Sequence, residues 1–209
     1  GTSGLGGLPS MGVEGRAERA ADNEDHADAA SIYIGLAGEA SGTERDRLTL
    51  LAVEQWLMAN DMTRARSAFN TLGKPAAGEN LWLWSANRAA FSLHDNDADA
   101  ALAIIEPLSR EPLPLEHRLR VEALRADAWF LQGDPARAVE LLVQRESWLT
   151  RKRDRERNQQ RLWRGLLASN PQNLRTAADV ASNPEVRGWL TLGSLAASTG
   201  QQGMGWSNG

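Results

Sequence analysis

The chain has 209 residues, 42% of them hydrophobic, and a formal net charge of −4 at neutral pH. This composition is that of a soluble globular protein, and so mild a charge leads us to expect no nucleic-acid partner. Cysteine is absent, which excludes disulfides and thiolate metal sites. No apolar run approaches the roughly 18 residues of a membrane span, and no basic start leads into a signal-peptide core.

The chain opens with the glycine-rich stretch GTSGLGGLPSMG, which is typical of a flexible linker or a cloning remnant. We therefore assign residues 1–22 to such a linker. Residues 23–200 are expected to form one helical repeat domain. Residues 201–209 are interpreted as a tail that leads to a downstream domain outside this sequence.

A small residue followed by a larger apolar one recurs four times, at a nearly constant period. The alanines of these pairs lie 36, 36 and 37 residues apart. A turn precedes each of the last three pairs: Asn60-Asp61, Asn96-Asp97 and Gly133-Asp134. Such a period is typical of helical-hairpin solenoids, in which each unit buries its apolar face against its neighbours. The four pairs are Ala29/Tyr33, Ala65/Phe69, Ala101/Ile105 and Ala138/Leu142.

Helical periodicity and capping residues predict helices throughout residues 23–200. The strongest start signal is Asp134-Pro135, which joins a capping carboxylate to a proline at the first helical position. Nothing is typical of a β-strand. We therefore expect an all-α, tetratricopeptide-like solenoid of nine or ten helices. The expected helices cover residues 23–40, 43 to about 59, 61 to about 72, 78–93, 97–108, 114–132, 134–148, 154–168, 173–180 and 184–197.

The turn, the small residue and the larger apolar residue resemble tetratricopeptide repeats, in units two or three residues longer than the usual 34. Three stretches narrow the resemblance: DRLTLLAVEQWLMANDMTRARSAFNTL (46–72), RERNQQRLWRGLLAS (155–169) and VRGWLTLGSLAA (186–197). Together they resemble the amino-terminal region of the LpoA/LppC-type penicillin-binding protein activators. The most specific residues are Asn158, Gln159, Gln160, Leu162, Trp163 and Leu166, then Gly188, Trp189, Leu190 and Leu192.

The resemblance implies a non-enzymatic periplasmic scaffold of an outer-membrane lipoprotein. Members of that family stimulate a class A penicillin-binding protein, which polymerises and crosslinks peptidoglycan. They join a helical repeat domain near the lipid anchor to a downstream domain like the periplasmic binding proteins, which is thought to bind the synthase. The implied partners are therefore the synthase, mainly through the downstream domain, peptidoglycan, and the outer membrane through the lipid anchor.

The polar residues suggest no catalytic, cofactor or metal site. Residues 95–106 have the acidic spacing of an EF-hand loop, but Ala100 stands where that loop needs glycine. We interpret Asp97 as a helix cap instead. The three histidines, His26, His94 and His117, are scattered and expected at the surface. A cell-wall hydrolase would need two carboxylates that face each other across a cleft, and no such pair is found.

Two features are candidate contacts for a protein partner. Tryptophans two residues apart cannot share one helix face, so at least one of Trp82 and Trp84 is expected to be partly exposed. Residues 145–164 hold eight basic and three acidic side chains, whereas residues 14–46 hold nine acidic and three basic ones. The candidate partner-binding residues are Trp82, Trp84, Trp148, Arg151, Lys152, Arg153, Arg155 and Arg157.

An alternative function is a generic tetratricopeptide module that binds peptide tails in an unrelated assembly. Such a module would carry a basic clamp for a carboxylate at the same place in successive units. Arg64 and Arg137 each precede a repeat alanine and fit this pattern. The matching position of the middle unit is Ala100, so the predicted clamp is incomplete.

Overall fold

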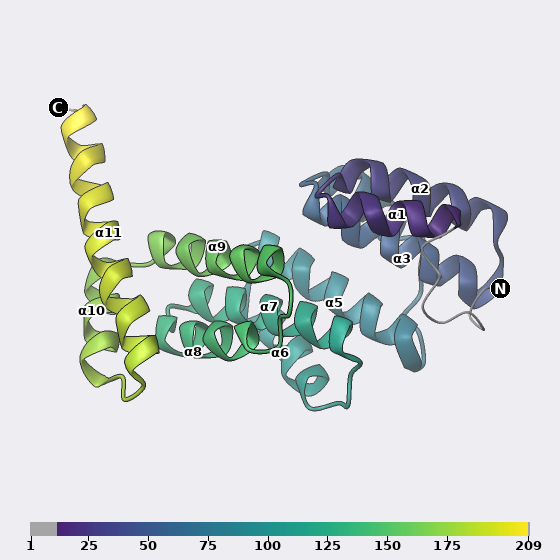
Figure 1. Ribbon diagram of the computed structural model, residues 1–209. Coiled ribbons are helices and arrows are strands. Elements are labelled where there is room, and N and C mark those ends of the chain that lie inside the picture. Colours follow the sequence, from purple (N-terminus) through teal and green to yellow (C-terminus); the bar gives the residue numbers. More distant parts are fainter. Residues whose placement is uncertain (1–11, 209) are drawn as a thin grey trace. The chain divides into compact units, whose positions relative to one another are not determined.

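The structure, a computed structural model, describes residues 12–208, with side chains described through residue 199. Over these residues the chain is all-α, with eleven helices and no strand (Figure 1). This confirms the predicted helical solenoid class. The helices are α1 (Val13–Asp22), α2 (His26–Glu39), α3 (Gly42–Met58), α4 (Met62–Phe69), α5 (Gly78–His94), α6 (Ala98–Ser109), α7 (Leu115–Gln132), α8 (Pro135–Glu146), α9 (Lys152–Ala168), α10 (Pro171–Val180) and α11 (Pro184–Asn208).

The chain divides into two compact units, and the division falls within α5, between Arg88 and Ala89. In the first unit, α1 packs on α2, α2 on α3 and α3 on α4. In the second unit the same order of neighbours runs from α6 to α9, and α10 and α11 pack together and against α8. Most contacts thus join helices that follow each other in sequence, as expected of stacked hairpins.

Helix α1 is the element that the sequence analysis missed, because it lies inside the predicted linker. Its inward residues, Gly15, Ala17 and Ala20, are all buried. Such small side chains form no stripe of large apolar residues, but they allow α1 to lie close against α2. The first eleven residues of the predicted linker lie outside the described part. At the other end, the backbone of α11 continues to Asn208, through most of the segment interpreted as a tail.

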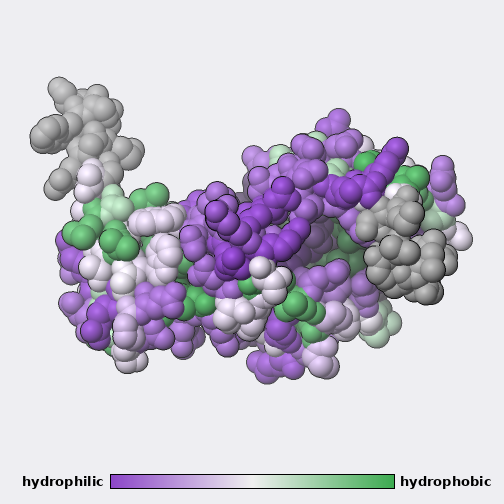
Figure 2. Space-filling model, in the orientation of Figure 1, coloured by the Kyte–Doolittle hydropathy of each residue, from purple (hydrophilic) through white to green (hydrophobic). Residues whose placement is uncertain are grey.

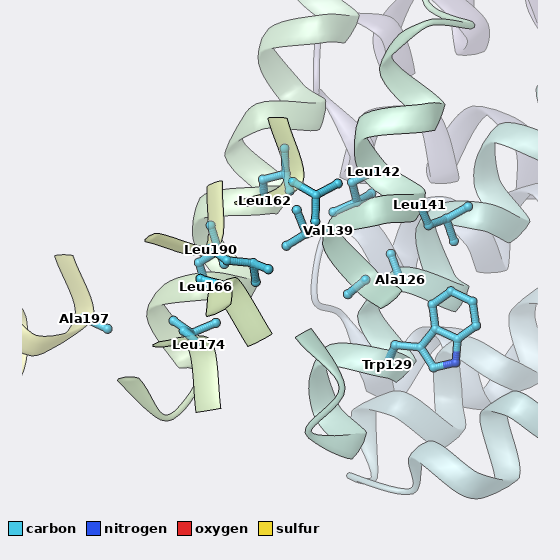
Figure 3. Close-up of a cluster of buried hydrophobic side chains, with 13 residues drawn as sticks. Ala126, Trp129, Val139, Leu141, Leu142, Leu162, Leu166, Leu174, Leu190 and Ala197 are labelled. Carbon is cyan, nitrogen blue, oxygen red and sulfur yellow. The ribbon is translucent and has the colours of Figure 1, made fainter. Parts of the chain in front are cut away.

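The alanines of the repeat are fully buried. Ala29, Ala65, Ala101 and Ala138 are all 0% exposed, and the larger residue four positions later is buried in every case. In the second unit the last of these pairs belongs to a continuous apolar core, drawn in Figure 3. That core joins α7 to α11 through Trp129, Val139, Leu141, Leu142, Leu162, Leu166, Leu174, Val186 and Leu190.

One turn geometry recurs before the four helices that carry these alanines. An aspartate occupies the N-cap position of each helix, and in α4, α6 and α8 its side chain accepts a capping hydrogen bond. The residue before it has a left-handed backbone: φ is 59° at Asn60 and Asn96, 87° at Gly133 and 64° at Glu24. The aspartate N–H donates to the carbonyl five residues back, at 2.8 Å in every turn. This is the hydrogen bond of a Schellman cap. Glutamate is the exception in the set, since asparagine and glycine tolerate this backbone best.

We expect Glu24→Asn to stabilise the fold by about 0.5–1 kcal/mol, because asparagine adopts the left-handed conformation at lower cost. The reverse exchange, Asn96→Glu, should destabilise by a similar amount, since Asn96 has the same turn geometry. Urea unfolding followed by circular dichroism measures both. Equal midpoints for the two variants would contradict the backbone explanation.

Candidate binding surface

The basic run at the start of α9 neutralises part of its own charge. Arg151 binds both carboxylate oxygens of Asp154, at 2.8 and 3.1 Å. Arg157 lies 3.7 Å from the same carboxylate, and Lys152 lies 3.8 Å from Glu156. Arg151, Lys152 and Arg153 are exposed. The run is therefore a solvated ion-pair network at the surface, and each exposed pair adds little to stability.

Arg155 differs from the rest of the run because its guanidinium binds the backbone. Its Nη1 donates to the carbonyl of Thr150 at 2.9 Å and reaches that of Leu149 at 3.4 Å. These carbonyls belong to the turn between α8 and α9, so Arg155 positions that turn. Trp148 lies in the same turn and is half-buried. The structure thus places Trp148 beside the basic run, as the sequence suggested.

The paired tryptophans of α5 are both half-buried. Trp84 stacks on Phe69 of α4, with ring centroids 5.4 Å apart. The cations of Lys74 and Arg88 lie 5.8 and 6.0 Å from the same ring. Trp84 is therefore a packing residue of the first unit that keeps part of its surface in solvent.

The arginines of the predicted carboxylate clamp are occupied by their own helix caps. Arg64 lies 2.6 Å from Asp61, and this pairing holds the pKa of the Asp61 carboxyl below its ordinary value. Arg137 pairs with Asp134 at 3.4 Å and lies over the ring of Trp129, 5.7 Å from its centroid. Each arginine is thus paired with the N-cap aspartate of its own helix. The geometry therefore does not favour the peptide-clamp alternative.

A partly buried polar link between three helices involves Arg145 and Asn158, to which the sequence pattern assigns no binding role. The Nε of Arg145, in α8, donates to the carbonyl of Leu119 in α7 at 2.9 Å, and its Nη1 donates to Oδ1 of Asn158 in α9 at 2.7 Å. The amide of Asn158 donates to the carbonyl of Leu142 at 2.8 Å. Burial, and then the neighbouring Arg161 cation, lowers the pKa of Arg145 to about 10. The family resemblance at Asn158 is the one sequence signal that points to this link.

The polar residues considered for metal or catalytic roles make structural contacts. Asp97 accepts a hydrogen bond from the backbone N–H of Ala100 at 3.0 Å, which confirms its assignment as a helix cap. The surface assignment of the histidines is correct for His94 alone. His117 is buried, and half-buried His26 shares a 2.8 Å hydrogen bond with Gln55. Burial of these rings follows from tertiary packing, which their isolated sequence positions do not indicate.

A family model, described as LppC putative lipoprotein, matches residues 23–205. The chain belongs to this family. The match covers the residues of α2 to α10 and most of α11, including Arg145, Asn158 and the basic run. No curated protein and no solved structure matches the chain.

Membership of the LppC lipoprotein family indicates a place in the cell envelope. Within residues 12–208, no helix combines the length and the apolar character needed to cross a bilayer. Several of the family-like residues quoted from the sequence belong to the core of the second unit. Leu162, Leu166 and Leu190 are 0% exposed, and the rings of Trp163 and Trp189 meet edge to face at 5.5 Å.

Proposed function

We propose that this chain is a non-enzymatic scaffold and docking domain of an outer-membrane lipoprotein that activates a class A penicillin-binding protein in peptidoglycan synthesis. The observation that carries the proposal is the LppC family match over residues 23–205. The stacked helical hairpins support it, because such stacks present extended surfaces for other macromolecules. The domain would act in the periplasm, with the lipid anchor and a downstream domain supplied by the longer protein.

The residues of the candidate surface fit a docking role better than a chemical one. Arg151, Lys152 and Arg153 are exposed, and the first two pair with carboxylates of the same helix. Exposed charges of this kind steer encounters and set partner choice more than they add affinity. In this proposal the downstream domain makes most of the contacts with the synthase. Peptidoglycan is a further partner of the lipoprotein.

The proposal is tested by titrating a purified class A synthase with the full-length lipoprotein and, separately, with this 209-residue chain. Binding is followed by surface plasmon resonance and glycan polymerisation by consumption of the lipid-linked precursor. We expect the full-length protein to bind and to raise the polymerisation rate, and the 209-residue chain alone not to raise it.

A monofunctional transglycosylase serves as the control enzyme, and its rate should not respond. Failure of the full-length lipoprotein to bind the class A synthase would overturn the proposed activation. Stimulation by the 209-residue chain alone would instead overturn the assignment of this domain as a scaffold and would place activation in the repeats.

A further inference from the structure

Beyond the network at its start, α9 carries a row of arginines along one side. Arg153, Arg157, Arg161 and Arg164 are spaced by four, four and three residues, which keeps them on the same side of a helix. We call these four residues the arginine row. Its length is about 16 Å, three helical turns. Figure 2 shows strongly hydrophilic surface over the N-terminal part of α9.

Basic side chains outnumber acidic ones around the arginine row, so a positive charge remains after every local ion pair is formed. Residues 151–164 contain seven basic and two acidic side chains. Two further carboxylates lie against α9: Asp127 of α7 pairs with Arg161, and Glu146 of α8 accepts a hydrogen bond from Gln159. Arg164 is exposed at the far end of the row. The local carboxylates are thus too few to neutralise the guanidinium groups.

The ion pair between Arg161 and Asp127, together with the approach of Phe130 to Gly165, places the second half of the row beside α7, where apolar side chains lie. Leu124 and Leu131 stand three residues before and four residues after Asp127, so they share its face of α7. Leu131 is 44% exposed and Leu124 is half-buried. The arginine row of α9 therefore lies beside apolar side chains of α7.

We propose that this surface of α7 and α9 docks an acidic amphipathic helix of a partner protein. Guanidinium groups bind carboxylates in a planar, two-pronged geometry, which favours carboxylates as the ligand. Carboxylates spaced by four, four and three residues on a partner helix match the row. The apolar face of such a helix covers Leu124 and Leu131. The proposal adds Arg161 and Arg164 to the candidate residues and leaves Arg155 in its role at the turn.

The test measures binding of two fluorescein-labelled 20-residue peptides to the 209-residue chain by anisotropy. The matched peptide is a helix with glutamates at that spacing and leucines on the adjacent face. The scrambled peptide has the same composition. We expect the matched peptide to bind at least tenfold more tightly, and its affinity to fall as salt rises from about 50 to 300 mM.

Arg153→Glu/Arg164→Glu should weaken binding of the matched peptide by at least tenfold, because two attractions become repulsions. The control is Arg45→Glu/Arg175→Glu, which changes the net charge equally at two exposed positions on helices other than α7 and α9. It should change affinity less than threefold. Circular dichroism melts of all variants report whether folding is preserved.

Equal loss in both double variants, or equal binding of the two peptides, would overturn the proposal, since net charge alone would then explain the affinity. Binding to vesicles of anionic phosphatidylglycerol with no binding of the matched peptide would also overturn it, in favour of a lipid surface. Self-association that Arg153→Glu/Arg164→Glu abolishes would reassign the row to a second copy of the chain. No synthase is present in this test, so its failure is distinguishable from failure of the proposed function.

Discussion

An Asn158→Ala variant is expected to unfold with a free energy about 2–4 kcal/mol lower than the parent chain. Asn158 is 1% exposed and joins α9 to α8 through hydrogen bonds to Arg145 and to the carbonyl of Leu142. Alanine removes both bonds, and the half-buried guanidinium then keeps its hydrogen bond to the Leu119 carbonyl but loses the one to Asn158.

Desolvation of the Arg145 cation, which also lowers its pKa, explains why this loss is costly. A cation whose pKa falls on folding is disfavoured in its charged form, and the value of about 10 lies above neutral pH. The folded chain therefore carries the full cost of desolvating the Arg145 cation at every pH below about 10. This cost decreases only as the pH rises through that value, so the fold becomes more stable relative to the unfolded chain there. The side-chain carbonyl of Asn158 offsets part of this cost, so its removal leaves more of the cost uncompensated.

Urea unfolding followed by circular dichroism measures the effect, with Gln160→Ala as the control, since Gln160 is exposed on the same helix. The control should stay within about 0.5 kcal/mol of the parent. Arg145→Met/Asn158→Leu should recover much of the loss, because apolar groups then replace both partners. A single variant no less stable than Gln160→Ala would rule out a structural role for this polar link.

Gly165→Ala is expected to destabilise the fold by about 1–3 kcal/mol, although alanine is the better helix former. A Cβ at position 165 of α9 would lie 2.2 Å from Cε2 and 2.3 Å from Cδ2 of Phe130 in α7. The ring must move away, and the packing of α7 against α9 is lost with it. Glycine at this position allows the aromatic ring to lie directly on the helix backbone.

The same substitution should change sign when the ring is absent. In a Phe130→Ala background, Gly165→Ala is expected to stabilise by about 0.5–1 kcal/mol, because only the difference in helix propensity remains. Gly188→Ala in α11 is the matched control in the parent chain, since nothing lies within 4 Å of the place that its methyl group would occupy. It should be stabilising. Thermal or urea unfolding of the four-member cycle decides the question, and additive effects at positions 130 and 165 would disprove the contact.

The sequence predicted the helices well where characteristic turn residues separate them. Asp61, Asp97 and Asp134 cap their helices through side-chain hydrogen bonds, as their positions after Asn or Gly suggested. The same reasoning failed for α1, because Glu24 occupies the left-handed turn position that glycine or asparagine marks elsewhere. A turn with an unfavourable residue gives no local signal, although the backbone hydrogen bond from Asp25 to Ala20 closes it as in the other three turns.

The roles of the basic residues 151–164 were predicted less completely than the fold. The basic run was found from composition, but its division into ion pairs, a turn-binding Arg155 and a row that continues to Arg164 depends on which side of α9 each residue occupies. That side is decided by Asn158, Leu162 and Leu166, which face the core. The charge count alone treats all these arginines as equivalent.

The sequence by itself determined the all-α class and the repeat period, because turn residues, small residues and apolar spacing act over a few residues or recur at a constant interval. The family was indicated by resemblance alone, in the stretches 46–72, 155–169 and 186–197. The tertiary structure alone decided which residues that are distant in sequence come into contact. Arg145 and Asn158 are 13 residues apart, and Gly165 and Phe130 are separated by 35. Their contacts exist only when neighbouring helices stack, so no local pattern could reveal them.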